Sequence, residues 1–223
     1  MPYSDINSPE FNDNRSYDYT RYETEDRLEY SVIEKMIPEN SKVIDLGCGN
    51  GSLLDRLKYK KKCTVTGVEI SESGVEVCHK KGITCFQKSI DVELPFENDS
   101  FDYSVCNVTI QMVMYPEVLL EEMKRISQNI IISFPNFAFY KNRIDLLTKG
   151  RMPRYCLFGY NWYNTGHIHQ LSIRDFSELV TKVGGLKTAE IQTVPSNGAL
   201  KNFLTYKIPD LFMLLPVIRL QKL

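Results

Sequence analysis

Long hydrophobic runs are missing from the sequence. The longest apolar stretch, Leu211–Ile218, is interrupted by Pro216 and is far shorter than the roughly 20 residues that a membrane span requires. Residues 1–19 are polar and acidic, so we also expect no signal peptide. These absences predict a cytoplasmic protein without a membrane span.

An excess of either charge is missing as well. The chain has 27 basic and 28 acidic residues, which gives a formal net charge of -1. Such a balance provides no overall positive field that would hold a polyanion. We therefore expect no nucleic-acid partner.

Cysteine pairs with metal-ligand spacing are missing too, although cysteine itself is present. No C-x-x-C occurs among the six cysteines, which are Cys48, Cys63, Cys78, Cys85, Cys106 and Cys156. Without paired spacing or a signal peptide, reduced thiols are favoured over a disulfide framework or a zinc site. We expect no metal site.

The length of 223 residues suits one full domain with additions. With 43% hydrophobic and 25% charged residues, the composition is that of an ordinary globular protein. Residues 1–36 are expected to form an acidic, tyrosine-rich arm that ends in a lid helix over residues 27–36. Residues 37–223 are expected to form the main domain, with an aromatic insert at about 149–170.

Strands and helices alternate from Lys42 onward. Short apolar or β-branched segments predict strands at residues 42–46, 64–70, 83–87, 103–108 and 129–134. One helix is predicted directly after Gly51 and another over Pro116–Ile126. A capping box of Ser73 with Glu76 predicts the start of a third helix between them. This rhythm implies right-handed βαβ units. The fold class is therefore α/β, with a Rossmann-like, doubly wound, mostly parallel sheet.

The pattern changes after residue 135. Ser172 with Asp175 predicts the start of a further helix, and Gly184 predicts its end. Residues 186–194 and 199–206 are then expected to pair as antiparallel strands at the C-terminal end of the sheet.

The first strand-to-helix turn carries three alternating glycines. It reads Asp45-Leu46-Gly47-Cys48-Gly49-Asn50-Gly51, and in doubly wound sheets ligands bind at this turn. A dinucleotide fingerprint needs glycine where Ser52 stands, so NAD is disfavoured. Glu69, which ends the second strand, could accept both hydroxyls of an adenosine ribose. Asp45 would repel phosphates and suits a ligand with an ammonium and a sulfonium group, both of which S-adenosylmethionine has.

These features resemble those of known enzymes. The sequence resembles class I S-adenosylmethionine-dependent methyltransferases through Val43–Gly51, Gly67–Ile70, Pro95–Phe96 and Phe101–Tyr103. It resembles the methionine biosynthesis protein MetW family more narrowly, through Ser133–Phe137, Gly150–Pro153, Trp162–Tyr163, His167–His169 and Ile173–Phe176. The resemblance implies the class I methyltransferase fold, with an antiparallel C-terminal strand and S-adenosylmethionine as cofactor.

The resemblance also implies a set of cofactor-binding residues. Asp45 and the glycines would hold the methionine moiety, Glu69 the ribose and Ile70 an adenine face. The family's usual adenine-contacting aspartate aligns with Ser89, for which a hydroxyl or the Ile90 backbone could substitute. The implied set is Asp45, Gly47, Cys48, Gly49, Gly51, Glu69, Ile70, Ser89, Ile90, Cys106 and Asn107.

Candidates for the acceptor site lie in the arm and the insert. Methyl transfer mainly needs alignment of donor and acceptor, and a base only when the acceptor is protonated. The catalytic candidates are Tyr19, His167 and His169, and the two histidines would face the same side of a strand. The substrate-binding candidates are Tyr17, Arg21, Tyr22, Gln111, Arg151, Arg154, Tyr160, Trp162 and Tyr163. Tyrosines with arginines suit a small anionic or ring-containing acceptor. The same residues could instead cover the sheet edge and face solvent.

Three functions stay open. The first is methyl transfer to oxygen or nitrogen of a small, anionic acceptor, such as a specialised or cell-surface metabolite precursor. The second, implied by the MetW resemblance, is a non-catalytic or regulatory partner of a homoserine O-acyltransferase in methionine biosynthesis. An RNA or protein methyltransferase is least favoured, despite a local lysine run at Lys58 and Lys60–Lys62. A homodimer also stays open.

Overall fold

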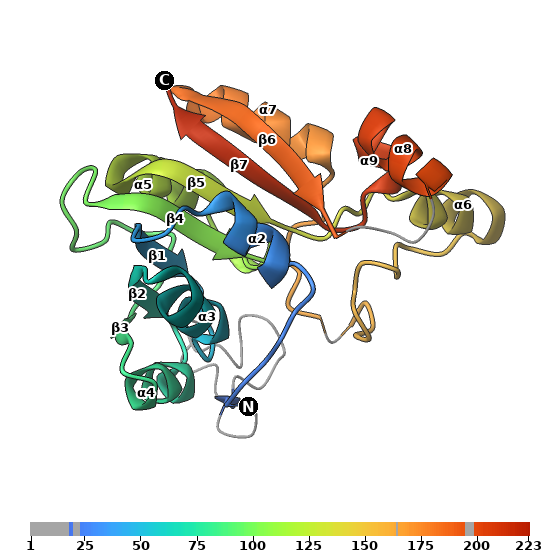
Figure 1. Cartoon of the computed structure of the whole chain (residues 1–223). Helices are drawn as coiled ribbons and strands as arrows, with labels where there is room; N and C mark the ends of the chain where they lie inside the picture. Colours follow the sequence, from blue (N-terminus) through green and yellow to red (C-terminus); the bar gives the residue numbers. More distant parts are fainter. Residues whose placement is uncertain (1–17, 20–22, 164, 195–198) are drawn as a thin grey trace.

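A computed structural model of the chain describes residues 18–19, 23–163, 165–194 and 199–223, with the side chains of 199–201 left aside. Its centre is a seven-stranded sheet in the order β3-β2-β1-β4-β5-β7-β6 (Figure 1). The strands are β1 (Lys42–Leu46), β2 (Thr64–Glu69), β3 (Thr84–Gln87), β4 (Phe101–Asn107), β5 (Ser127–Ser133), β6 (Leu186–Thr193) and β7 (Pro216–Lys222). Strands β1 to β5 are parallel, and β7 runs antiparallel to both of its neighbours. The predicted fold class is confirmed.

Helices cover both faces of the sheet (Figure 1). The helices that flank it are α2 (Tyr30–Met36), α3 (Ser52–Lys61), α4 (Glu72–Lys80), η2 (Ile110–Met112), α5 (Pro116–Ile126) and α7 (Ile173–Val183). Neighbouring residues of β1 point to opposite faces, because side chains alternate along a strand. Val43 packs in the cluster with α2 and α3, whereas Ile44 packs in the cluster with α5 and α7.

Serine caps fix where two helices begin. Ser172 and Asp175 form the predicted capping box at α7, with each side chain accepting a hydrogen bond from the other residue's backbone amide. The predicted cap of α4 is wrong. Ser71, not Ser73, caps that helix and accepts a hydrogen bond of 3.4 Å from the Gly74 amide. The chain turns immediately after Glu69, so the helix begins two residues earlier than the pattern indicates.

The predicted strand at residues 199–206 is also wrong. This segment forms helix α8 (Ala199–Lys207), which a short helix α9 (Pro209–Phe212) follows. The partner of β6 is β7, which lies between β5 and β6 and buries Val217, Ile218 and Leu220. Pro216 is the first residue of β7, a position where a strand tolerates proline. A strand between two other strands is buried by its neighbours. The more apolar C-terminal segment therefore takes this place in the sheet.

Helix α6 (Tyr140–Lys149) lies with α8 and α9 beyond the carboxyl end of β5 (Figure 1). Arg143 of α6 forms an ion pair of 2.8 Å with Asp210 of α9, and the Tyr140 and Phe212 rings lie 5.5 Å apart. An irregular segment connects α6 to α7, and its described residues are 150–163 and 165–172. Among the described residues, no helix has both the length and the apolar character to cross a membrane.

Candidate functional site

The glycine turn lies between β1 and α3, at the carboxyl edge of the sheet. Gly47, Gly49 and Gly51 all have positive φ angles, of 82°, 54° and 71°. A Cβ on Gly47 would lie 2.6 Å from the Thr109 methyl carbon, so side-chain contact as well as backbone conformation requires glycine there. The Gly47 amide also donates a hydrogen bond of 2.8 Å to the Val68 carbonyl of β2. The turn is therefore held in one shape by its neighbours.

Glu69, at the end of β2, faces this turn, and its carboxylate accepts three backbone hydrogen bonds. Its Oε2 accepts from the Gly49 amide at 2.8 Å, and its Oε1 accepts from the Ile70 and Ser71 amides, both at 2.9 Å. Burial raises the pKa of this carboxyl, while the three amide donors act in the opposite direction. Glu69 thus fixes the glycine turn and keeps further lone pairs for a ligand.

Asp45, just before the turn, is buried without a full set of partners. Its side chain is 2% exposed, and Oδ1 has no hydrogen-bond partner among the described residues. Burial, together with the nearby Cys78 and Glu69, raises the pKa of Asp45 to about 8. A cation beside this carboxyl would supply the missing partner and favour its ionised form. The ammonium group of S-adenosylmethionine fits this environment.

A cavity of about 1250 Å³ begins at the glycine turn and continues to the insert and α9. The predicted site residues that line it are Tyr19, Asp45, Gly47, Cys48, Gly49, Glu69, Ile70, Ser89, Ile90, Asn107, Tyr160 and His167. Most of these belong to the implied cofactor set and follow the carboxyl ends of β1, β2, β3 and β4. The topology therefore brings the cofactor candidates together.

Two of the cofactor candidates lie outside the cavity lining. Gly51 is the N-cap residue of α3, where its left-handed conformation lets the helix begin. Cys106 is fully buried on β4, in the core cluster with α5. Gly51 is thus placed at a helix start and Cys106 in the core, and neither lines the cavity.

Most of the described substrate candidates lie outside this lining. Gln111 is fully buried and donates from Nε2 to the Val108 carbonyl at 2.9 Å. The side chains of Trp162 and Tyr163 are exposed and contact each other edge to face. The other insert candidates that do not line the cavity are Arg151 and Arg154. Tyr17, Arg21 and Tyr22 lie outside the described residues.

The two candidate histidines are separated by the irregular backbone of the insert. His167 lines the cavity, and its ring meets Phe137 edge to face at 5.8 Å. The Nε2 atom of His169 lies 3.0 Å from the Val113 carbonyl oxygen, in the loop before α5. The shared-face expectation fails because residues 165–172 do not form a strand. Of the two, only His167 is placed to meet a ligand in this cavity.

Ser89 and Asp91 form a hydrogen-bonded pair in the loop after β3. The other carboxylate oxygen of Asp91 accepts from the Met114 and Tyr115 amides, both at 3.1 Å. Asp91 therefore ties the loop after β3 to the loop after β4. Ser89 and Ile90 line the cavity beside it, where the family's adenine-contacting residue is expected.

Lys141 is a cavity-lining residue that the sequence did not indicate. It lies on α6, and its Nζ is 5.2 Å from the centroid of the Tyr155 ring. Tyr155, Phe139 and Phe212 line the same end of the cavity. No motif marks these residues, because only the packing of α6 and α9 against the insert brings them to the site.

Solved structures share this fold. A methyltransferase of Thermotoga maritima aligns with a TM-score of 0.60 at 21% identity and covers 87% of each chain. An S-adenosylmethionine-dependent methyltransferase of Mesorhizobium loti aligns with a TM-score of 0.60 at 16% identity, covering 88% of this chain and 98% of that chain. With the strand order above, these likenesses define a class I S-adenosylmethionine-dependent methyltransferase fold.

Sequence comparison gives the narrower assignment. The family model described as methionine biosynthesis protein MetW matches residues 27–209, so the chain belongs to the MetW family. The bifunctional methionine biosynthesis protein MetXA/MetW of Rhodopirellula baltica is 34% identical over 173 residues. That alignment covers 73% of this chain and 28% of the relative, so the chain spans less than a third of the relative's length.

Proposed function

We propose that this protein is an S-adenosylmethionine-dependent methyltransferase that acts on oxygen or nitrogen of a small, anionic acceptor. The single observation that carries the proposal is the cavity, whose volume of about 1250 Å³ extends over two chemically different halves. Pockets for one drug-sized ligand measure roughly 300–1,000 Å³, so this volume suits a donor and an acceptor side by side.

The donor half has the groups that S-adenosylmethionine needs. Asp45 offers a carboxyl to a cationic group, and Glu69 offers oxygen acceptors to ribose hydroxyls. Ile70 and Ile90 supply apolar contacts for an adenine ring. The bound donor supplies a methyl group already activated on a sulfonium, so the chain's task is alignment.

The acceptor half is aromatic and carries the exposed cation of Lys141. Lys141 would pair with an anionic group of the acceptor, beside the rings of Tyr155 and Tyr160. His167 is the candidate to take a proton from an acceptor that reacts through a protonated oxygen or nitrogen. Lys141 replaces Arg151 and Arg154 as the anion-binding candidate, because it lines the cavity and they do not.

The arm at residues 1–36 belongs to this proposal as a lid over the donor half. A Cβ on Gly49 would lie 3.3 Å from the Tyr19 ring, and the Tyr19 amide donates to the Ser73 hydroxyl at 3.1 Å. Glu29, at the start of α2, accepts from the Asn107 amide group at 3.2 Å. These contacts support an arm that folds over the glycine turn, ahead of a main domain at 37–223. We place the protein in the cytoplasm, as a biosynthetic role suggests.

Calorimetric titration with S-adenosylmethionine and S-adenosylhomocysteine tests the donor site. We expect both to bind the unmodified chain, and we expect Asp45→Asn and Glu69→Gln to weaken binding by at least about tenfold, or 1.4 kcal/mol. Glu72→Gln is the matched control, because Glu72 is exposed at the start of α4 and does not line the cavity. If Asp45→Asn and Glu69→Gln both bind S-adenosylmethionine and S-adenosylhomocysteine with unchanged affinity, the assignment of the donor site is wrong.

A second function is favoured by one specific observation. The Rhodopirellula baltica relative carries its MetW part in one chain with a MetXA part. A separate chain could serve the same purpose by binding a homoserine O-acyltransferase and regulating it. Co-purification with such an acyltransferase, together with the absence of methyl transfer to any acceptor tested, would promote this function over the first.

A further inference from the structure

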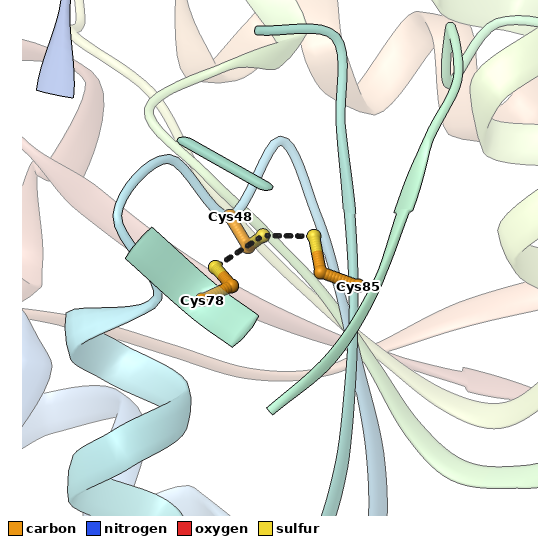
Figure 2. A group of neighbouring side chains, drawn as sticks. All are labelled: Cys48, Cys78 and Cys85. Atoms are coloured by element: carbon orange, nitrogen blue, oxygen red, sulfur yellow. Dashed lines mark hydrogen bonds between the residues drawn. The ribbon is translucent and has the colours of Figure 1, made fainter. Parts of the chain in front are cut away.

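Three cysteines from three separate segments of the chain meet at the glycine turn (Figure 2). Cys48 belongs to the turn, Cys78 to α4 and Cys85 to β3 (Figure 2). The Cys48 sulfur lies 3.8 Å from the Cys78 sulfur and 3.6 Å from the Cys85 sulfur. All three sulfur atoms lie within 4.8 Å of one another, and all three residues are buried. Figure 2 shows their side chains converging from three separate segments.

Two glycines keep the space that these sulfur atoms occupy. A Cβ on Gly67 would lie 2.6 Å from the Cys48 sulfur and 3.2 Å from the Cys85 sulfur. A Cβ on Gly51 would lie 2.7 Å from the Cys78 sulfur. Glycine at these two positions thus leaves room for the three sulfur atoms.

We propose that Cys48, Cys78 and Cys85 bind a zinc ion as thiolates. Zinc–sulfur bonds of about 2.3 Å at tetrahedral angles place two sulfur ligands about 3.8 Å apart. The distances of 3.8 and 3.6 Å from Cys48 match this spacing, and the third sulfur pair, Cys78 with Cys85, lies within 4.8 Å. Thiolates are the soft ligands that zinc selects.

A backbone oxygen lies beside two of the three sulfur atoms. The Gly49 carbonyl oxygen lies 3.5 Å from the Cys78 sulfur and 4.0 Å from the Cys48 sulfur. An oxygen ligand at about 2.1 Å from zinc would lie about 3.6 Å from a sulfur ligand. The carbonyl oxygen therefore lies within about 0.4 Å of that spacing from two of the three sulfur atoms.

The charges balance when the thiols release their protons. Three thiols and one Zn²⁺ ion give a complex with a charge of −1 and three protons that pass to solvent. Lys81 supplies positive charge nearby, since its Nζ donates to the Asn50 carbonyl at 2.8 Å and its charge acts on Cys78. The ion would tie the glycine turn to α4 and β3.

Metal analysis of the whole chain, purified with a phosphine reductant, tests this site. After loading with Zn²⁺ and removal of the excess, we expect one zinc ion per chain. Cys78→Ser and Cys85→Ser should each lower zinc affinity by at least about tenfold. Cys63→Ser is the matched control and should keep the full zinc content, because Cys63 packs with α2 and α3, away from the cluster.

A second measurement uses the unmodified chain, so it does not depend on the folding of any variant. Bound zinc should protect three of the six cysteines against alkylation beyond the protection seen in the metal-free chain, and a chelator should remove that difference. Titration with Cd²⁺ should produce the ultraviolet absorption of cadmium–thiolate bonds, with an endpoint at one ion per chain. A chain that retains no zinc and gives no such absorption would overturn the proposal. A chain whose mass is lower by two hydrogens, from a disulfide within the cluster, would overturn it as well.

Discussion

The Nε2 atom of His169 lies 3.0 Å from the carbonyl oxygen of Val113, which ties the end of the insert to the loop before α5. The His169 and Ile168 amides both donate to the Gln111 carbonyl, at 3.0 and 3.1 Å. His169 belongs to the histidine motif that resembles the MetW family. That motif is thus partly architectural, while His167 from the same motif lines the cavity.

Loss of the His169 side-chain contact should lower stability. We expect His169→Ala to reduce the free energy of unfolding by about 1–3 kcal/mol, because the Val113 carbonyl loses its donor. Urea unfolding followed by circular dichroism measures the change. Gln170→Ala is the control: its side chain is exposed, and we expect a change within about 0.5 kcal/mol. Equal stability of the two variants would contradict the structural role of His169.

The strands and helices that local pattern predicts best are those with strong boundary signals. The strand Lys42–Leu46 and the helix Pro116–Ile126 agree with the prediction residue for residue. The error at 199–206 has a different origin. Local sequence does not state which segment a strand will pair with, and β7 gains its place through burial between two neighbours.

The same limit applies to the candidate site. Its donor half follows the carboxyl ends of consecutive parallel strands, so the order of the motifs predicts that Asp45 and Glu69 meet. Lys141 and Phe212 come from α6 and α9, and no spacing rule connects them to the glycine turn. The three clustered cysteines escape a spacing search for the same reason, since topology alone brings them together.

Alanine substitutions at Gly47 and at a control glycine should separate the stability cost of backbone strain from that of steric contact. In Gly47→Ala, the new methyl group would meet Thr109, whose hydroxyl is held by a hydrogen bond of 2.9 Å to the Asn107 carbonyl. Gly150→Ala is the matched control, since Gly150 has a φ of 61° and a Cβ placed there would meet no atom within 4 Å. We expect the control to cost about 1–2 kcal/mol from the left-handed backbone alone. Gly47→Ala should cost about 1–3 kcal/mol more, from overpacking.

Chemical denaturation of both variants gives the difference directly. The double variant Gly47→Ala with Thr109→Ser removes the nearest methyl carbon and should recover part of the additional loss. Equal losses of unfolding free energy in Gly47→Ala and Gly150→Ala would show that the Thr109 side chain moves aside without a measurable cost. The glycine turn would then be less rigid than its contacts indicate.

Lys141 should control acceptor binding and leave donor binding unchanged. We expect Lys141→Gln to raise the KM for an anionic acceptor by about tenfold, the effect of losing one charge-assisted hydrogen bond. The Kd for S-adenosylmethionine should not change, because Lys141 belongs to α6 and is not among the proposed donor-binding residues at the ends of β1 to β4. Lys149→Gln is the control on the same helix, since Lys149 pairs with Asp145 at 2.6 Å outside the cavity lining. If the Kd for S-adenosylmethionine rises as much as the KM for the acceptor, the cavity does not have separate donor and acceptor halves.

Asp45 should make stability and donor binding depend on pH. Burial raises its pKa in the folded chain from 3.8 to about 8. Between these values the folded chain holds a proton that the unfolded chain has lost, so the contribution of Asp45 to stability is greatest at low pH and falls as pH rises through this range. The loss is about 1.4 kcal/mol per pH unit within that range. An asparagine side chain cannot ionise, so Asp45→Asn should be more stable than the unmodified chain near pH 8, and the difference should shrink toward pH 4. Urea unfolding at a series of pH values measures both curves.

Proton release gives the matching test for the donor. A cation bound beside Asp45 favours the carboxylate, so at neutral pH binding of S-adenosylmethionine should release a proton from the unmodified chain. Calorimetry in buffers of different ionisation enthalpy counts that proton, and Asp45→Asn should release correspondingly fewer. Affinity should therefore rise with pH up to about 8 in the unmodified chain. Equal proton counts in the two proteins would show that Asp45 does not meet the cationic part of the donor, even if the donor binds.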